Sequence, residues 1–125
     1  MSWSIDLFIS GPSSLSEVAA QIETLTGLHL QHVVKDEREK FETYEREYLV
    51  TVGRHDLVND GDRQFERYPY KVSVWPAGSG DKDHEVSTAF ATRLYEQLEK
   101  THRYRVMLVA DLLDKLRESA PMNAP

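Results

Sequence analysis

The segment from Arg105 to Ala110 constrains the fold most, because it is apolar on both alternating faces. One face would carry Val106, Leu108 and Ala110, and the other would carry Met107 and Val109. A half-exposed strand alternates apolar and polar side chains, so this pattern predicts a central strand that is covered on both sides. The chain therefore needs a sheet that is covered by other chain segments on both of its faces.

A second strand is predicted at the start of the chain, over residues 3–9. Its apolar side chains recur at a period of two, at Trp3, Ile5, Leu7 and Ile9. Phe8 falls on the opposite face, which indicates that this strand is also partly covered on both sides. Gly11 and Pro12 end it.

Two helices are predicted from capping signals and apolar spacing. Ser14 precedes Glu17 by three residues, the spacing of a reciprocal capping box, and Gly27 can end the helix, which we place at 15–26. A second helix follows the break at 76–80 and is capped by Asp81 or Asp83. Its buried stripe would consist of Val86, Ala89, Phe90, Leu94 and Leu98.

Three further strands are predicted in the middle of the chain, at 28–34, 41–52 and 68–75. Residues 35–40 are all charged and predict a solvated turn. A helix over 37–47 is the alternative for the next segment, but its later aromatic and β-branched residues favour a strand. A polar loop at 53–67 connects the last two strands, and Pro69 places the start of the final one at an edge or outside the ladder.

The last predicted element is a short helix that Asp111 caps and that carries Leu112, Leu113 and Leu116. A frayed tail is expected at 121–125. The element order is β-α-β-β-β-α-β plus this short helix, within a single domain over 1–120. We therefore expect an α+β fold: a two-layer sandwich with a mixed or antiparallel sheet of about five strands and two main helices. The short helix would help to cover the second face.

Charge and cysteine content narrow the classes of function. The 125 residues include 21 acidic and 15 basic side chains, a formal net charge of −6, which argues against a nucleic-acid-binding surface. The lack of cysteine excludes disulfides, thiolate zinc sites and a cysteine nucleophile. No apolar run approaches the ~18 residues of a membrane span, and no signal peptide is evident. We expect a cytoplasmic protein that binds neither nucleic acid nor membrane.

No motif predicts a metal, a cofactor or a catalytic residue. The acids at 81–85 are better explained as a helix start than as a cation site. The loop from Asp56 to Arg67 fails as a calcium loop, because Val58 and Arg67 stand where oxygen ligands are needed. Neither a nucleophile elbow nor a phosphate-binding glycine loop is found.

Three residues support an alternative function as a small enzyme or small-molecule-binding domain. Asp6 and Asp111 belong to the two interior strands, and if those strands were neighbours the two carboxylates would approach a shared cleft. His32 is the third candidate. Structural roles explain these residues at least as well. The two acids could be solvated strand ends or helix caps, and His32 could be a hydrogen-bonded, partly buried histidine.

Aromatic residues next to acids are the remaining feature. Tyr44, Tyr68, Tyr70 and Trp75 surround a hairpin whose loop carries Asp56, Asp60, Asp62 and Glu66. Aromatic anchors ringed by acids suit a basic protein partner. The alternative is that the tyrosines belong to the core and the acids only solvate the loop. We take Asp56, Asp60, Asp62, Glu66, Tyr68 and Trp75 as the predicted partner-binding set.

Four stretches, at 5–12, 25–27, 68–74 and 106–112, resemble small bacterial proteins of the toxin-immunity type. The resemblance lies in fold-making residues, so it transfers no functional residue. It implies a small, acidic, cysteine-poor binder that blocks a toxin by occluding it. The leading hypothesis is thus a non-catalytic inhibitor of a basic protein. The alternatives are a pocket between sheet and helices, and a homodimer formed by sheet-edge pairing.

Overall fold

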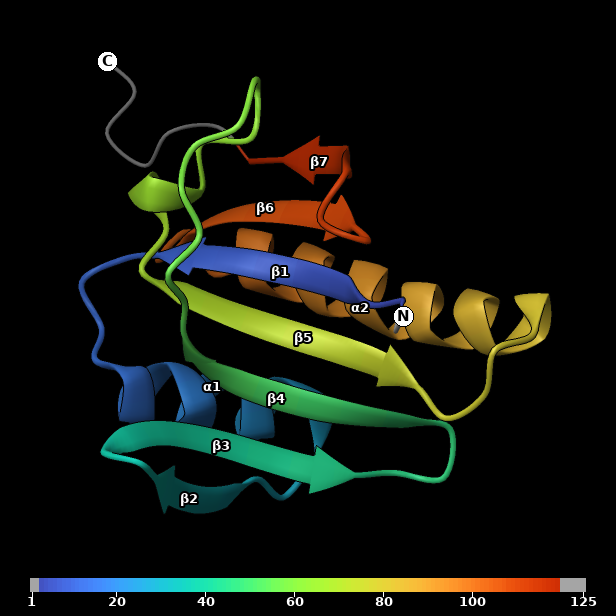
Figure 1. Cartoon of the computed structure of the whole chain (residues 1–125). Coiled ribbons are helices and arrows are strands. Elements are labelled where there is room, and N and C mark those ends of the chain that lie inside the picture. Colours follow the sequence, from blue (N-terminus) through green and yellow to red (C-terminus); the bar gives the residue numbers. More distant parts are fainter. Residues whose placement is uncertain (1–2, 120–125) are drawn as a thin grey trace.

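The computed structural model describes residues 3–119 and has an α+β architecture, with two α-helices and a seven-stranded antiparallel sheet (Figure 1). The elements are β1 (Ile5–Ser10), α1 (Leu15–Thr26), β2 (Gln31–Lys35), β3 (Arg38–Tyr44), β4 (Tyr48–Arg54), the 3₁₀ helix η1 (Phe65–Arg67), β5 (Tyr70–Pro76), α2 (Asp81–Lys100), β6 (Arg105–Ala110) and β7 (Asp114–Glu118). The strand order is β2-β3-β4-β5-β1-β6-β7. The expected α+β class is confirmed, whereas the expected count of five strands is wrong.

The centre of the molecule repeats a known supersecondary pattern. β1, α1, β4, β5, α2 and β6 follow the order β-α-β-β-α-β of the ferredoxin-like, split β-α-β arrangement. The β2–β3 hairpin is inserted after α1, and β7 extends the other edge beyond β6. This arrangement hosts many unrelated functions, so the topology assigns none to this chain.

The single strand predicted at 41–52 is wrong, because the segment belongs to two strands joined by a turn at 45–47. β3 begins at Arg38, inside the stretch that the sequence predicted as a turn. Only Asp36 and Glu37 turn the chain there, with φ values of 52° and 63°. Two adjacent residues of positive φ are typical of a tight hairpin turn between twisted strands. The alternative helix over 37–47 is also wrong.

The short last helix is also wrong, and β7 takes its place. Asp111 and Leu112 have φ values of 51° and 58°, which turn the chain back instead of starting a right-handed helix. β7 then pairs with the outer edge of β6. Because β6 is buried, its backbone groups need this partner. Asp111 is thus a turn residue and caps no helix.

Both predicted main helices are confirmed, and they lie together on one side of the sheet (Figure 1). The capping box of Ser14 and Glu17 is present, and Gly27 has a φ of 77°. The cap of α2 differs from the prediction, because Gly80 is the N-cap and its N–H donates to the carboxylate of Asp83 at 3.3 Å. Ala89 of the predicted buried stripe is exposed. The helices cover the main core, which includes Ile5, Leu7, Val72, Val74 and Leu108.

A second, smaller core lies on the opposite face of the sheet. It contains Phe8, Phe65, Tyr68, Met107 and Val109. Phe65 and Tyr68 come from the segment between β4 and β5, which crosses in front of β1 and β6 in Figure 1. The prediction that β1 and β6 are covered on both sides is therefore confirmed. The cover is this segment, and no last helix is involved.

The chain outside 3–119 is not described, so the tail predicted at 121–125 lies outside the described residues. Within that range, neither helix combines the length and the apolar character that a membrane crossing requires.

Candidate functional site

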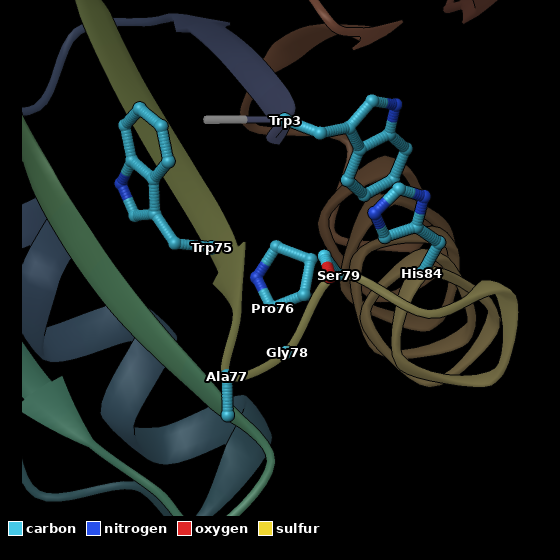
Figure 2. Close-up of a pocket in the computed structure, with 7 residues that line it drawn as sticks. All are labelled: Trp3, Trp75, Pro76, Ala77, Gly78, Ser79 and His84. Atoms are coloured by element: carbon cyan, nitrogen blue, oxygen red, sulfur yellow. The ribbon is translucent and has the colours of Figure 1, made fainter. Parts of the chain in front are cut away.

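A pocket of about 530 Å³ lies at one end of the sheet, where β5 leads into α2 (Figure 2). Its lining residues are Trp3, Trp75, Pro76, Ala77, Gly78, Ser79 and His84. We call this hollow the aromatic pocket. Its volume is in the usual range for pockets that hold small ligands or single side chains.

The local sequence explains how the pocket forms. β1 and β5 are antiparallel neighbours, so the beginning of β1 meets the end of β5, and Trp3 comes close to the segment after Trp75. Pro76 ends β5, and residues 77–80 cross to the first turn of α2. Gly78 lets the Asp83 carboxylate come close, because a Cβ atom at this position would lie 2.5 Å from that carboxylate and would force the Asp83 side chain to shift.

The aromatic walls come from opposite sides of this crossing, as Figure 2 shows. Trp3 packs partly against the helix-side core, and its indole stacks on the imidazole of His84. Trp75 follows the buried Val74 in β5, so its side chain points to the face of the sheet away from the helices. Trp3, Trp75 and His84 are all only partly exposed.

Acid-rich segments adjoin the aromatic pocket, although no carboxylate is among its lining residues. The surrounding segments are Trp3–Ser4, 45–47, 75–85 and 111–114, which we call the acidic end. Backbone hydrogen bonds hold them together: Ala77 N–H donates to Glu47 O at 3.0 Å, and Asp111 N–H donates to Ser4 O at 2.7 Å. The acidic end contains seven acids, Glu45, Glu47, Asp81, Asp83, Glu85, Asp111 and Asp114, and two bases, Arg46 and Lys82. Its formal charge of −5 accounts for most of the net charge of −6.

None of these seven carboxylates forms an ion pair within residues 3–119. Asp83 is explained by its cap at the start of α2, and the dipole of that helix accounts for Asp81 as well. Glu45, Glu47 and Asp111 lie in turns between strands, and Asp114 begins β7, so neither explanation applies to these four acids. The acidic end is therefore a surface of negative charge that its own chain neutralises little.

The loop acids predicted as binding residues are engaged differently. Asp56 pairs with Arg38, Asp60 with Arg63 at 2.7 Å, and Asp62 lies 3.8 Å from the ammonium of Lys115. Glu66 accepts a hydrogen bond from the Asn59 N–H at 3.0 Å. All four carboxylates have local partners, so this loop offers much less free charge than the sequence suggested.

Tyr68 is fully buried, which corrects the expectation of an exposed aromatic anchor at this position. Its hydroxyl donates to Glu118, and Arg105 lies over its ring. Tyr70 is buried as well, whereas Tyr44 is 78% exposed. Trp75 lies at the opposite end of β5 from the loop. The predicted partner-binding residues therefore do not form one surface. Trp75 lies in the aromatic pocket with Trp3 and His84, away from the loop acids.

The residues proposed for an enzyme are brought together only in part. β1 and β6 are indeed neighbours, and the negative charge of Asp111 adds to the effect of burial in raising the pKa of Asp6. Asp6 is only 1% exposed, however, so it presents no surface to a substrate. His32 lies far away on β2, where its Nε2 contacts Glu39 at 2.8 Å and its ring stacks on Phe41.

Other hollows and clusters give weaker sites. A pocket of about 200 Å³ between α1, α2 and β4 is lined by Tyr48, Phe90, Arg93 and Gln97 among others, and it contains none of Asp6, His32 and Asp111. In the described part of the chain, no group of three or more histidines and acids is arranged to hold a metal ion.

Sequence reasoning missed Trp3 and His84 as site residues. Trp3 was assigned to the apolar face of the first strand and His84 to a helix start; the helix start is correct, and Trp3 lies on the expected face but just before β1 begins. Only the pairing of β1 with β5 shows that these two positions meet. Comparison of the chain with known protein families, curated proteins and solved structures finds no match.

Proposed function

We propose that this is a non-catalytic, cytoplasmic binding protein of the immunity type, which occludes a basic partner protein with its acidic end. The observation that carries the proposal is the aromatic pocket next to segments whose carboxylates form no ion pairs in residues 3–119. Interfaces typically place aromatic anchors at their centre and polar groups at the rim, and this end of the sheet has that arrangement.

The charge supports association in two ways. A local formal charge of −5 attracts a cationic surface over a distance of about one Debye length, which speeds the encounter. The same charge repels acidic proteins and nucleic acids, which supports selectivity for basic partners. We take the helices and the sheet as a two-layer sandwich. This rigid scaffold holds the turns of the acidic end in place, so binding needs no change in the fold.

The experiment compares two pairs of charge reversals. One pair, Glu45→Lys with Glu47→Lys, changes the acidic end. The matched control pair, Asp60→Lys with Asp62→Lys, changes the loop acids by the same charge. Each chain is immobilised and exposed to lysate of the native host at low and high salt, and bound proteins are identified by mass spectrometry.

We expect the wild type and the loop variant to retain the same basic protein in a salt-sensitive manner, and the 45/47 variant to lose it. Retention that survives the 45/47 change, or a captured protein that is acidic, would contradict the proposal. If only the loop variant lost the basic protein, the interface would lie at Asp60 and Asp62. All variants are checked by thermal unfolding.

A further inference from the structure

We propose that the aromatic pocket receives an arginine side chain of the partner, whose guanidinium stacks on the Trp75 indole while the carboxylates of the acidic end offset its charge. This inference rests on the proposed function and names the chemistry of its central contact. Figure 2 shows the two indoles on either side of the segment 76–79. Three observations carry the assignment.

The first observation concerns the cation–π contacts within the chain. Four arginines lie over aromatic rings in the described part of the chain, and all four rings belong to tyrosines: Arg54 over Tyr70, Arg103 over Tyr104, Arg105 over Tyr68 and Arg117 over Tyr95. Tryptophan is the better acceptor of a cation. Neither Trp3 nor Trp75 has such a partner within residues 3–119.

The second observation is the charge around the pocket. The acidic end carries seven carboxylates and two cations, and its carboxylates form no ion pairs in residues 3–119. A cation that enters the pocket would be attracted by the rings and by these charges together. An anionic ligand would be repelled by the same groups, and a neutral one would gain nothing from them.

The third observation is the shape of the site. One face of Trp3 is covered by His84, with 4.2 Å between ring centroids, so the pair forms a fixed, flat wall. Trp75 supplies a second ring that is only partly exposed. A planar guanidinium stacks on such surfaces more readily than a compact ammonium does, which favours arginine over lysine. About 530 Å³ also leaves room for the neighbouring residues of a peptide.

The chain contains a built-in reporter, because its only two tryptophans both line the pocket. The probe is a short peptide with one central arginine between two lysines, and its matched control replaces that arginine with the neutral, nearly isosteric citrulline. Tryptophan fluorescence is titrated with each peptide at low salt. Binding is also followed by fluorescence anisotropy of a dye on the peptide, which does not depend on the tryptophans.

We expect the arginine peptide to quench the tryptophan emission and to bind more tightly than the citrulline peptide. Trp75→Leu should weaken the arginine peptide by about three- to thirty-fold and remove most of its advantage over citrulline. Thermal unfolding checks that the variant is folded. A third peptide with lysine in place of the arginine keeps the charge, so its weaker binding to the wild type would support the stacked guanidinium, and its equal binding would overturn it, even if Trp75→Leu fails to fold.

The outcomes separate this inference from the proposed function. Equal binding of both peptides, lost in the 45/47 charge reversal but unchanged in Trp75→Leu, would keep the acidic end and overturn the arginine pocket. No binding of either peptide would contradict both. Tighter binding of the citrulline peptide, or an equal fluorescence response to a neutral disaccharide, would show that the rings serve a neutral ligand and would also overturn the inference.

Discussion

The indole of Trp3 stacks on the imidazole of His84, with 4.2 Å between ring centroids and 9° between ring planes. The contact joins Trp3, two residues before β1, and the first turn of α2, which are distant in the sequence. It therefore fixes the helix start against the sheet and builds one wall of the aromatic pocket. Stability and site geometry depend here on the same pair of side chains.

We expect His84→Ala to lower the free energy of unfolding by about 0.5–1.5 kcal/mol, because the variant loses a stacked aromatic contact. Urea unfolding measures the change. His29→Ala is the matched control, since the His29 side chain is 99% exposed, and its effect should stay below about 0.5 kcal/mol. Equal effects of the two changes would show that the stack does not stabilise the fold.

Asp6→Asn should stabilise the protein at neutral pH by about 1 kcal/mol, because the native carboxylate is buried with few partners. Asp6 Oδ2 accepts a hydrogen bond from the Ser4 hydroxyl at 3.2 Å, but Oδ1 and the Ser73 hydroxyl opposite have none in the described structure. Burial is the main cause that raises the pKa of Asp6 above its ordinary value of 3.8.

The raised pKa of Asp6 determines how the free energy of unfolding changes with pH. A raised pKa means that Asp6 favours the folded state most below pH 3.8 and that this contribution is lost as the pH rises through the folded-state value. Unfolding of wild type and Asp6→Asn should therefore differ at about pH 7 and converge at about pH 3. Asp36→Asn, at an exposed turn, is the control. A less stable Asp6→Asn at neutral pH would contradict the prediction.

His55 should make the fold less stable in mildly acidic solution. Its Nδ1 accepts a hydrogen bond from the Leu57 N–H at 3.1 Å, and its Nε2–H donates to the Tyr68 carbonyl, so the neutral ring is held at both nitrogens. Burial lowers the pKa of His55 below 6.5. This contribution to stability is present above pH 6.5 and is lost as the pH falls through the lowered folded-state pKa.

Urea unfolding at about pH 7.5 and about pH 5.5 tests this effect. His55→Asn should be less stable than wild type at the higher pH and should lose less on acidification. His29→Asn, at an exposed position, should keep the wild-type slope. A slope that His55→Asn leaves unchanged would assign the pH dependence to other groups.

Tyr68→Phe should cost about 1 kcal/mol of stability and leave partner binding unchanged. The buried hydroxyl donates to Glu118, which also lies 3.0 Å from the Lys115 ammonium, so the change removes one member of a partly buried network. Tyr44→Phe, at an exposed side chain, should change stability by less than about 0.5 kcal/mol. Loss of binding in Tyr68→Phe without a change in unfolding would restore Tyr68 as a contact residue.

Elements with a strong local signal could be predicted from the sequence. The capping box of Ser14 and Glu17 involves residues three apart, so α1 carries its own start signal. The double-sided apolar pattern of β6 is equally local, and its burial on both faces is confirmed. In these cases neighbouring residues contain the physical cause of the structure.

The first part of β3, residues 38–40, and all of β7 could not be predicted in this way. β3 is rich in charged residues, and β7 has the sequence Asp-Lys-Leu-Arg-Glu, with exposed Leu116 at its centre. Such sequences show no buried face, and their β-propensity depends on the neighbouring strand. β4 and β6 supply the free backbone edges that turn these segments into strands.

By itself, the sequence determined the α+β class, the two main helices, the interior strands β1 and β6, and the excess of acids, because each depends on local periodicity or on composition. Only the tertiary structure decided which charges are free and which aromatics meet. The pairing of distant segments neutralised Asp56, Asp60 and Asp62, buried Tyr68, and placed Trp75 in one pocket with Trp3 and His84. Strand order and register set these contacts, and they arise from long-range packing that no single segment encodes.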